Sequence, residues 1–304
     1  MNAQTTKECA HIYASPKTQS IQKSLKWFNF KHIVNKQFHN PKRNKGKVTF
    51  KKFNKKINVK SFKIEGFQAI TISTKQSTNK HLVYLHGGAY VIQASKAHRK
   101  LIEKFATNYN FRVTFIDYPL APENTYKTTH RVLLAIYKKL IKLYPNDEFI
   151  LIGDSAGGGL ALAFAQVLRD KRIKPFPSKT ILLSPWLDIS MSNEQIAEYE
   201  SKDNILPVEG LKYTAKLYSG GDNLQNPLLS PIFGNMNNLG DILLFFGTKE
   251  VFYPDCIELT DKINNSDSTT VNCVIGEGMM HDWIIFSSPE TDTTIKIISD
   301  FISN

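Results

Sequence analysis

The sequence lacks any long hydrophobic run. No stretch approaches the roughly 18 uninterrupted apolar residues that a bilayer-spanning helix needs, and the first residues lack the basic-then-apolar profile of a secretory signal. Cysteine is scarce, since the chain has only Cys9, Cys256 and Cys273, an odd number without CxxC spacing. This set favours a reducing compartment and supports neither a disulfide framework nor a zinc site. We therefore expect a cytoplasmic protein.

Acidic residues are nearly absent from the first part of the chain. Residues 1–80 carry 18 Lys and Arg against two acids, a net charge of +16, whereas the remaining 224 residues carry −4. A lysine-rich face in contact with solvent accounts for this asymmetry. The alternative is attraction to an anionic surface, for which we expect a weak membrane contact rather than nucleic acid. Nothing in the sequence indicates the oligomeric state.

The 304 residues, 41% of them hydrophobic, suffice for one domain with a small additional subdomain. Residues 1–18 look irregular, 19–38 predict an amphipathic helix, and 47–73 predict short alternating strands. After residue 80, apolar runs alternate with helical patterns, which predicts the α/β class with a mostly parallel central sheet flanked by helices. We expect strands at 81–86, 112–118, 149–153, 179–184, 241–247 and 269–276, and helices from near 125 and 155, at 254–265 and at 289–303.

The most informative motif is Gly153-Asp154-Ser155-Ala156-Gly157-Gly158. It follows the apolar run FILI and precedes the apolar helix LALAFAQVL, which is the strand–turn–helix setting of a nucleophile elbow. Glycines at both ends allow the sharp turn because a side chain there would collide with the strand or the helix. Ser155 is therefore the candidate nucleophile. A phosphate-binding or purely structural glycine turn is the alternative.

A serine hydroxyl needs a general base at neutral pH. His281 follows the last expected strand, at the carboxyl edge where catalytic groups of open α/β sheets gather, and is the candidate base. His81 heads a strand and His86 belongs to a second motif. The other five sit in polar or helical contexts and are interpreted as surface residues: His11, His32, His39, His98 and His130.

A carboxylate is needed to orient the base. Glu250 lies three residues beyond the expected strand DILLFFG and is the first choice; Asp255 is the second, although it could instead cap the helix that Pro254 starts. Asp282 is adjacent to His281 and poorly placed to reach around its ring. Chain order Ser, acid, His fits either of the first two candidates.

An oxyanion formed at the serine needs backbone N–H donors. The sequence His86-Gly87-Gly88-Ala89 ends the strand HLVYLH one strand–helix unit before the elbow. Gly87 and Gly88, together with the N–H of Ala156 at the helix start, are the candidate donors. No cofactor and no metal site are predicted.

Together these motifs resemble the hormone-sensitive-lipase-like family of α/β-hydrolase esterases and lipases. The match covers residues 80 to 285 and includes HGGA, DYPLAPE, GDSAGG, SPWLD, NPLLSPIFG, GTKE and MMH in the same order. The resemblance implies an α/β-hydrolase fold with a triad of Ser155, an acid at 250 and His281. This sequence differs from the family pattern in two places: Ala89 replaces the usual last glycine of HGGG, and Glu250 replaces the usual aspartate.

The resemblance also implies a helical cap from residues 19–40 and 187–225 that controls substrate entry. We therefore expect an N-terminal cap segment at 1–45, a catalytic domain at 46–304 and a cap insertion at about 187–225. The expected activity is hydrolysis of short-to-medium acyl esters through an acyl-enzyme, with a small-molecule ester as the partner. The alternatives are a lipase acting on longer chains and a non-catalytic small-molecule-binding protein on the same fold.

Overall fold

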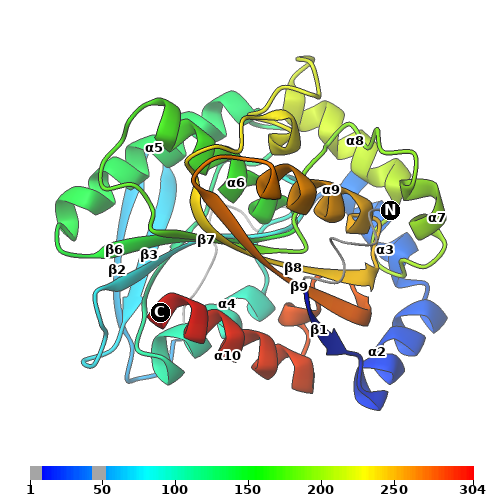
Figure 1. Ribbon diagram of the computed structural model, residues 1–304, viewed down its shortest axis with the longest axis horizontal. Coiled ribbons are helices and arrows are strands. Elements are labelled where there is room, and N and C mark those ends of the chain that lie inside the picture. Colours follow the sequence, from blue (N-terminus) through cyan, green and yellow to red (C-terminus); the bar gives the residue numbers. More distant parts are fainter. Residues whose placement is uncertain (1–8, 43–52) are drawn as a thin grey trace.

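The computed structural model describes residues 9–42 and 53–304. In this part of the chain, nine strands form one sheet in the order β1-β9-β8-β7-β6-β4-β5-β3-β2 (Figure 1). Only the β2–β3 and β3–β5 pairs are antiparallel. The strands are β1 Ala10–Tyr13, β2 Asn58–Ile64, β3 Phe67–Ser73, β4 Lys80–Leu85, β5 Arg112–Ile116, β6 Glu148–Asp154, β7 Lys179–Leu183, β8 Gly240–Lys249 and β9 Thr269–Met280.

Helices cover both faces of this sheet. In Figure 1, α4 and α10 lie below it and α5, α6 and α9 lie above it. The bounds are α2 Pro16–Trp27, α3 Phe30–His39, α4 Lys96–Asn108, α5 Tyr126–Leu143, α6 Ala156–Asp170, α7 Ile196–Glu200, α8 Val208–Ser219, α9 Tyr253–Asn264 and α10 Pro289–Ser303, with 3-10 turns η1 Pro231–Phe233 and η2 Trp283–Ile285. This arrangement confirms the α/β class and the mostly parallel sheet predicted from the sequence.

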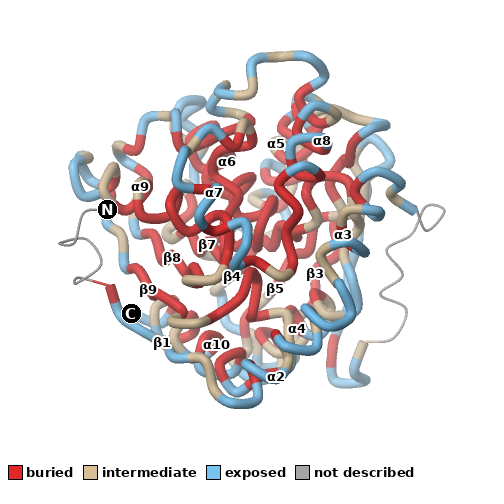
Figure 2. Tube along the Cα trace, turned by 90° about the vertical axis from the view of Figure 1, so that its right-hand side faces the viewer, coloured by how far each residue is buried: buried red, intermediate tan, exposed pale blue. Residues whose placement is uncertain are grey.

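The central strands are apolar on both faces because helices bury both. Residues Leu82–Leu85 of β4 and Phe149–Ile152 of β6 are at most 1% exposed, as expected for parallel strands between two helical layers. Figure 2 shows the resulting buried interior surrounded by exposed helices and loops. Among the described residues, no helix is long and apolar enough to cross a membrane.

The N-terminal part differs from the sequence prediction in two respects. Residues 10–13 are not irregular but form β1, an edge strand parallel to β9. The single helix expected at 19–38 is two helices, because Asn29 adopts a left-handed conformation (φ 49°) between α2 and α3, which asparagine tolerates better than most residues. The strand expected around residues 48–53 falls almost entirely outside the described residues.

The prediction that the cysteines form no disulfide is wrong for one pair. Cys9 and Cys273 are bonded across a sequence separation of 264 residues, with their Cα atoms 4.8 Å apart. The pairing of β1 with β9 brings them together, since Ala10 pairs with Val274 and Cys9 precedes it directly. Sequence spacing contains no trace of this contact. Cys256 is free and buried.

A separate group of helices lies beside the carboxyl ends of the sheet. Strands β8 and β9 end on the side of the molecule where α2, α3, α7 and α8 are found (Figure 1). Helices α3 and α8 contact each other, as do α2 and α3. Both N-terminal helices and the helices of the segment 187–225 therefore lie on the side of the molecule at which the sequence placed its candidate residues.

Candidate active site

Ser155 occupies the turn between β6 and α6. Its backbone has φ 52° and ψ −121°, a sparsely populated region that costs a non-glycine residue roughly 1–3 kcal/mol. The surroundings leave no room for side chains at the ends of this turn. A Cβ atom on Gly153 would collide with the carbonyl of Gly157, and one on Gly157 would collide with the carbonyl of Leu85. The local sequence therefore presents the serine on a strained, tightly packed turn.

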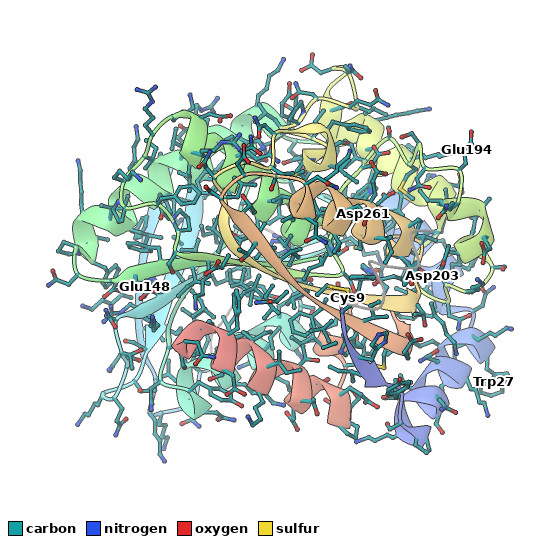
Figure 3. All side chains as sticks on the ribbon, in the orientation of Figure 1. Cys9, Trp27, Glu148, Glu194, Asp203 and Asp261 are labelled. Atoms are coloured by element: carbon teal, nitrogen blue, oxygen red, sulfur yellow. A yellow bond between two sulfur atoms is a disulfide. The ribbon has the colours of Figure 1, made fainter. Side chains whose placement is uncertain are left out.

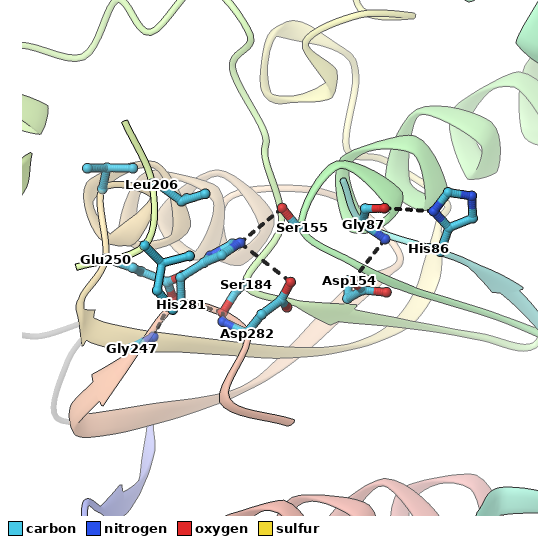
Figure 4. Close-up of polar contacts among 12 residues, drawn as sticks. His86, Gly87, Asp154, Ser155, Ser184, Leu206, Gly247, Glu250, His281 and Asp282 are labelled. Atoms are coloured by element: carbon cyan, nitrogen blue, oxygen red, sulfur yellow. Dashed lines mark hydrogen bonds and ion pairs between the residues drawn. The ribbon is translucent and has the colours of Figure 1, made fainter. Parts of the chain in front are cut away.

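Three predicted residues form one hydrogen-bonded chain (Figure 4). The His281 Nε2 atom is 3.0 Å from the Ser155 Oγ, and the Nδ1 atom is 2.6 Å from a carboxylate oxygen of Glu250. Glu250 follows β8 and His281 follows β9, its neighbour in the sheet. Because these strands are parallel, residues beyond their carboxyl ends meet at the same edge, next to the turn that follows β6.

The Glu250 carboxylate is fully buried and firmly held. Its second oxygen accepts hydrogen bonds from the Ser184 hydroxyl at 3.0 Å and from the Gly247 N–H at 2.5 Å. Asp255 lies instead in α9, where its carboxylate accepts from the Asn193 amide and burial raises its pKa to about 8. Of the two acids left open by the sequence, Glu250 is therefore the one in contact with His281.

Asp282 lies closer to the reacting groups than the sequence suggested. One of its carboxyl oxygens is 3.5 Å from His281 Nε2, the nitrogen that faces Ser155, while the other is buried with no hydrogen-bond partner in the described part of the chain. It does not reach the Nδ1 side of the ring, as expected. Burial raises the pKa of Asp282 well above its ordinary value, more than the nearby His281 lowers it, and the charge of Asp154 raises it further.

These carboxyl groups change the basicity of His281. Burial alone lowers the pKa of the imidazole, but the charge of Asp282 and the hydrogen bond and charge of Glu250 outweigh that effect and raise the pKa to about 9. An imidazolium in this site is thus well stabilised. Proton transfer from Ser155 to His281 would produce that cation.

The expected donors of an oxyanion site are not all available. The Gly87 N–H donates to the Asp154 carboxylate at 2.9 Å, so the prediction that this N–H serves an oxyanion is wrong in this structure. A backbone N–H has one proton to donate, and here it is already donated in a hydrogen bond to a buried carboxylate. Within residues 9–42 and 53–304, the N–H groups of Gly88, Ala89 and Ala156 have no such partner.

Asp154 organises the underside of the elbow, and sequence reasoning missed its partners. Its carboxylate also accepts from the Tyr84 hydroxyl at 2.5 Å and contacts His98 Nε2 at 3.1 Å. Burial would raise the pKa of Asp154, but these contacts keep it below its ordinary value. His98 is 6% exposed and His130 is 7% exposed, so their interpretation as surface residues is wrong. The residues around His98 and His130 in the sequence gave no indication that these side chains are buried.

A segment before α8 is tied to the loop that carries Glu250. Asp203 is buried and accepts hydrogen bonds from the Ile205, Leu206 and Val251 N–H groups. Val251 directly follows Glu250. Ser155 and His281 are only 5% and 3% exposed.

Comparison with known proteins agrees with this architecture. Residues 82–285 match the family described as having the alpha/beta hydrolase fold. An esterase of Acinetobacter venetianus is 28% identical over 257 residues, 83% of this chain and 84% of that protein. An acetyl-hydrolase of Streptomyces hygroscopicus is 29% identical over 73% of this chain and 74% of that protein. The crystal structure of an esterase from the bacterial hormone-sensitive lipase family has a TM-score of 0.80 and 26% identity, covering 96% of this chain and 98% of that one.

The chain therefore belongs to the α/β-hydrolase fold family. The resemblance to hormone-sensitive-lipase-like proteins that the sequence motifs predicted is confirmed, and so is the expected enzyme class, a hydrolase built on a serine-hydrolase fold.

Proposed function

We propose that this protein is a carboxylic ester hydrolase that acts on short-to-medium acyl esters with Ser155, His281 and Glu250 as its catalytic triad. The observation that carries the proposal is the continuous chain of hydrogen bonds from the Ser155 hydroxyl through the His281 ring to the Glu250 carboxylate. Such a chain gives a nucleophile, a base and a group that fixes the tautomer of the base. The names of the esterase relatives agree with this chemistry.

The reaction would proceed in two halves. The Ser155 oxygen attacks the ester carbonyl carbon while its proton passes to His281 Nε2, and Glu250 stabilises the imidazolium. The tetrahedral intermediate then expels the alcohol, which takes that proton and leaves an acyl-enzyme. A water molecule, deprotonated by His281, attacks the acyl carbonyl. Collapse of the second intermediate returns the proton to Ser155 and releases the carboxylic acid.

The oxyanion of each intermediate would be stabilised by the N–H groups of Gly88 and Ala156, with Ala89 as a third donor. All three are unpaired within the described chain, and Ala156 is the first residue of α6, where an N–H has no intrahelical partner and the helix dipole favours negative charge. Gly87 would contribute indirectly, because its bond to Asp154 holds the loop against the elbow.

Helices α2, α3, α7 and α8 would act as the cap that limits which acyl groups enter. The Asp203 hydrogen bonds connect this layer to the loop of Glu250, so that movement of the cap would be transmitted to the triad. A lipase acting on long acyl chains is the nearest alternative, and a non-catalytic binding protein is a second. The cytoplasmic location remains a prediction. The disulfide between Cys9 and Cys273 contradicts the argument for a reducing compartment that was based on the cysteines.

Hydrolysis of p-nitrophenyl esters from acetate to palmitate tests the proposal. We expect the highest kcat/KM for acetate to octanoate, and a loss of at least roughly 10³-fold in Ser155→Ala. A preference for palmitate would support the lipase alternative. Equal rates for the wild type and Ser155→Ala would refute the mechanism, and no hydrolysis of any ester by the wild type would favour a binding protein.

A further inference from the structure

The turn between α2 and α3 exposes an aromatic pair to solvent. Trp27 is 80% exposed and Phe28 is 64% exposed, and their ring centroids are 4.6 Å apart. Figure 3 shows Trp27 at the outer edge of the molecule, pointing away from it. Trp27 and Phe28 are thus two neighbouring members of the eight large hydrophobic side chains that are exposed in the described residues. Exposure of this much apolar surface in one place typically marks a contact site.

Lysines surround this aromatic pair. The helices α2 and α3 contain five lysines and no acidic residue. Beside α2 lies a groove of about 660 Å³ lined by Lys23, Lys26, Lys202 and Lys249, with Glu277 as its only acid. That carboxylate is itself paired with His11 at 3.0 Å. Lys202 is paired with Glu198 at 2.7 Å, so the positive charge of the groove comes mainly from Lys23, Lys26 and Lys249.

This combination suits a lipid surface better than a protein partner. The centres of protein interfaces are depleted of lysine, whereas tryptophan and lysine together are typical of segments that lie in the headgroup region of a membrane. The ring of Trp27 has an apolar body and a polar N–H, which allows it to sit between acyl chains and headgroups. Lysine ammonium groups attract phosphate and carboxylate headgroups over roughly one Debye length.

We propose that the α2–α3 turn docks the protein on anionic lipid bilayers, with Trp27 and Phe28 entering the interfacial region and the lysine groove receiving anionic headgroups. The same helices lie beside the carboxyl edge of the sheet (Figure 1), so the docked molecule would hold its active site close to the membrane. Ester substrates dissolved in the membrane would then reach the site without crossing bulk water. This last consequence rests on the proposed function, whereas docking itself does not.

Intrinsic fluorescence gives a direct test because Trp27 is the only exposed tryptophan. The chain has three tryptophans, and Trp186 and Trp283 are at most 2% exposed. Addition of phosphatidylcholine–phosphatidylglycerol vesicles at low ionic strength should shift the emission to shorter wavelengths. Vesicles of phosphatidylcholine alone should shift it much less, and added salt should reverse the shift.

Co-sedimentation with the same vesicles measures binding of the wild type and of matched variants. Lys23→Glu/Lys26→Glu should weaken binding by roughly tenfold or more, and Trp27→Ser/Phe28→Ser should also weaken it. The controls are Lys138→Glu/Lys142→Glu, which reverses two exposed lysines on α5, and Leu143→Ser, which removes a side chain that is 51% exposed. Both controls should bind like the wild type.

Several results would overturn lipid docking. The first is no sedimentation with anionic vesicles at low salt, and the second is an equal loss of binding in the α5 controls. Tighter binding to a DNA duplex than to vesicles would indicate nucleic acid instead. A change of oligomeric mass in Trp27→Ser/Phe28→Ser without vesicles would indicate a protein interface. Ser155→Ala should bind the vesicles like the wild type, and hydrolysis of p-nitrophenyl acetate by the wild type in solution needs no membrane. Failure of docking is thus distinguishable from failure of the proposed esterase activity.

Discussion

Replacement of Asp282 by asparagine should shift the pH dependence of ester hydrolysis. The base His281 must be neutral to accept the Ser155 proton, so the acid limb of kcat/KM follows the pKa of His281 in the free enzyme. That pKa is raised to about 9, and the charge of Asp282 is the largest of the effects that raise it. We therefore expect the wild type to gain activity up to about pH 9. Asp282→Asn should reach its maximum at lower pH.

The geometry gives the size of this shift. Two unit charges 3.5 Å apart, the distance from Asp282 to His281 Nε2, interact by about 5 kcal/mol at an effective dielectric constant of about 20. Only part of this is expressed, because burial and the charge of Asp154 raise the pKa of Asp282 and so oppose its ionisation. Since one pKa unit corresponds to about 1.4 kcal/mol, a shift of at least one unit toward lower pH is expected.

The assay is kcat/KM for p-nitrophenyl butyrate between pH 5.5 and about 9.5, fitted to a single ionisation on the acid side. The matched control is Asp255→Asn. Asp255 is also a buried aspartate with a raised pKa, but its carboxylate contacts Asn193 rather than His281. Its acid limb should coincide with that of the wild type.

An unchanged acid limb in Asp282→Asn, or a shift to higher pH, would refute this reasoning. The other charged groups around the ring, Glu250 and Asp203, are the same in both proteins. A simple loss of stability would lower the activity at every pH and leave the shape of the profile intact. The displacement of the limb is therefore specific to the electrostatic contact.

Three further predictions concern the triad, the elbow and the disulfide. Glu250→Gln should lower kcat by roughly 10³–10⁴-fold because the amide cannot stabilise the imidazolium, whereas Asp255→Asn should change kcat less than about threefold; similar losses in the two would refute the assignment of the acid. Gly157→Ala should lower the free energy of unfolding by about 2 kcal/mol or more, and a thermal midpoint equal to that of the wild type would show that the turn is looser than described. Cys9→Ser should cost about 2–4 kcal/mol of unfolding free energy. Thiol titration of the unfolded, unreduced wild-type protein should find one reactive thiol, that of Cys256; three reactive thiols would exclude the bond between Cys9 and Cys273.

The sheet and the central pair of residues could be predicted from the sequence because local patterns determine them. The run FILI is buried on both faces and the glycines after it permit the turn, so these few residues suffice to place Ser155 at the end of a central strand. His281 followed from the position of the last strand. These inferences need only the period of the apolar residues and the rule that parallel strands end at the same edge.

Contacts between distant segments could not be predicted in this way. The β1 strand is only four residues long and gains its order from β9, and the Cys9–Cys273 bond depends on that pairing. The choice between Glu250 and Asp255 depended on where the chain turns after β8. Likewise, the bond from Gly87 to Asp154 depends on the packing of two loops, and no spacing between motifs reports it.

The central claim is that Ser155 is a nucleophile activated by His281. Reaction of the native protein with a fluorophosphonate, followed by peptide mass spectrometry, tests it most directly. We predict a single modified residue, Ser155, with labelling abolished in Ser155→Ala and strongly slowed in His281→Ala. Absence of labelling in the folded wild-type protein, or modification of another residue that persists in Ser155→Ala, would contradict the claim.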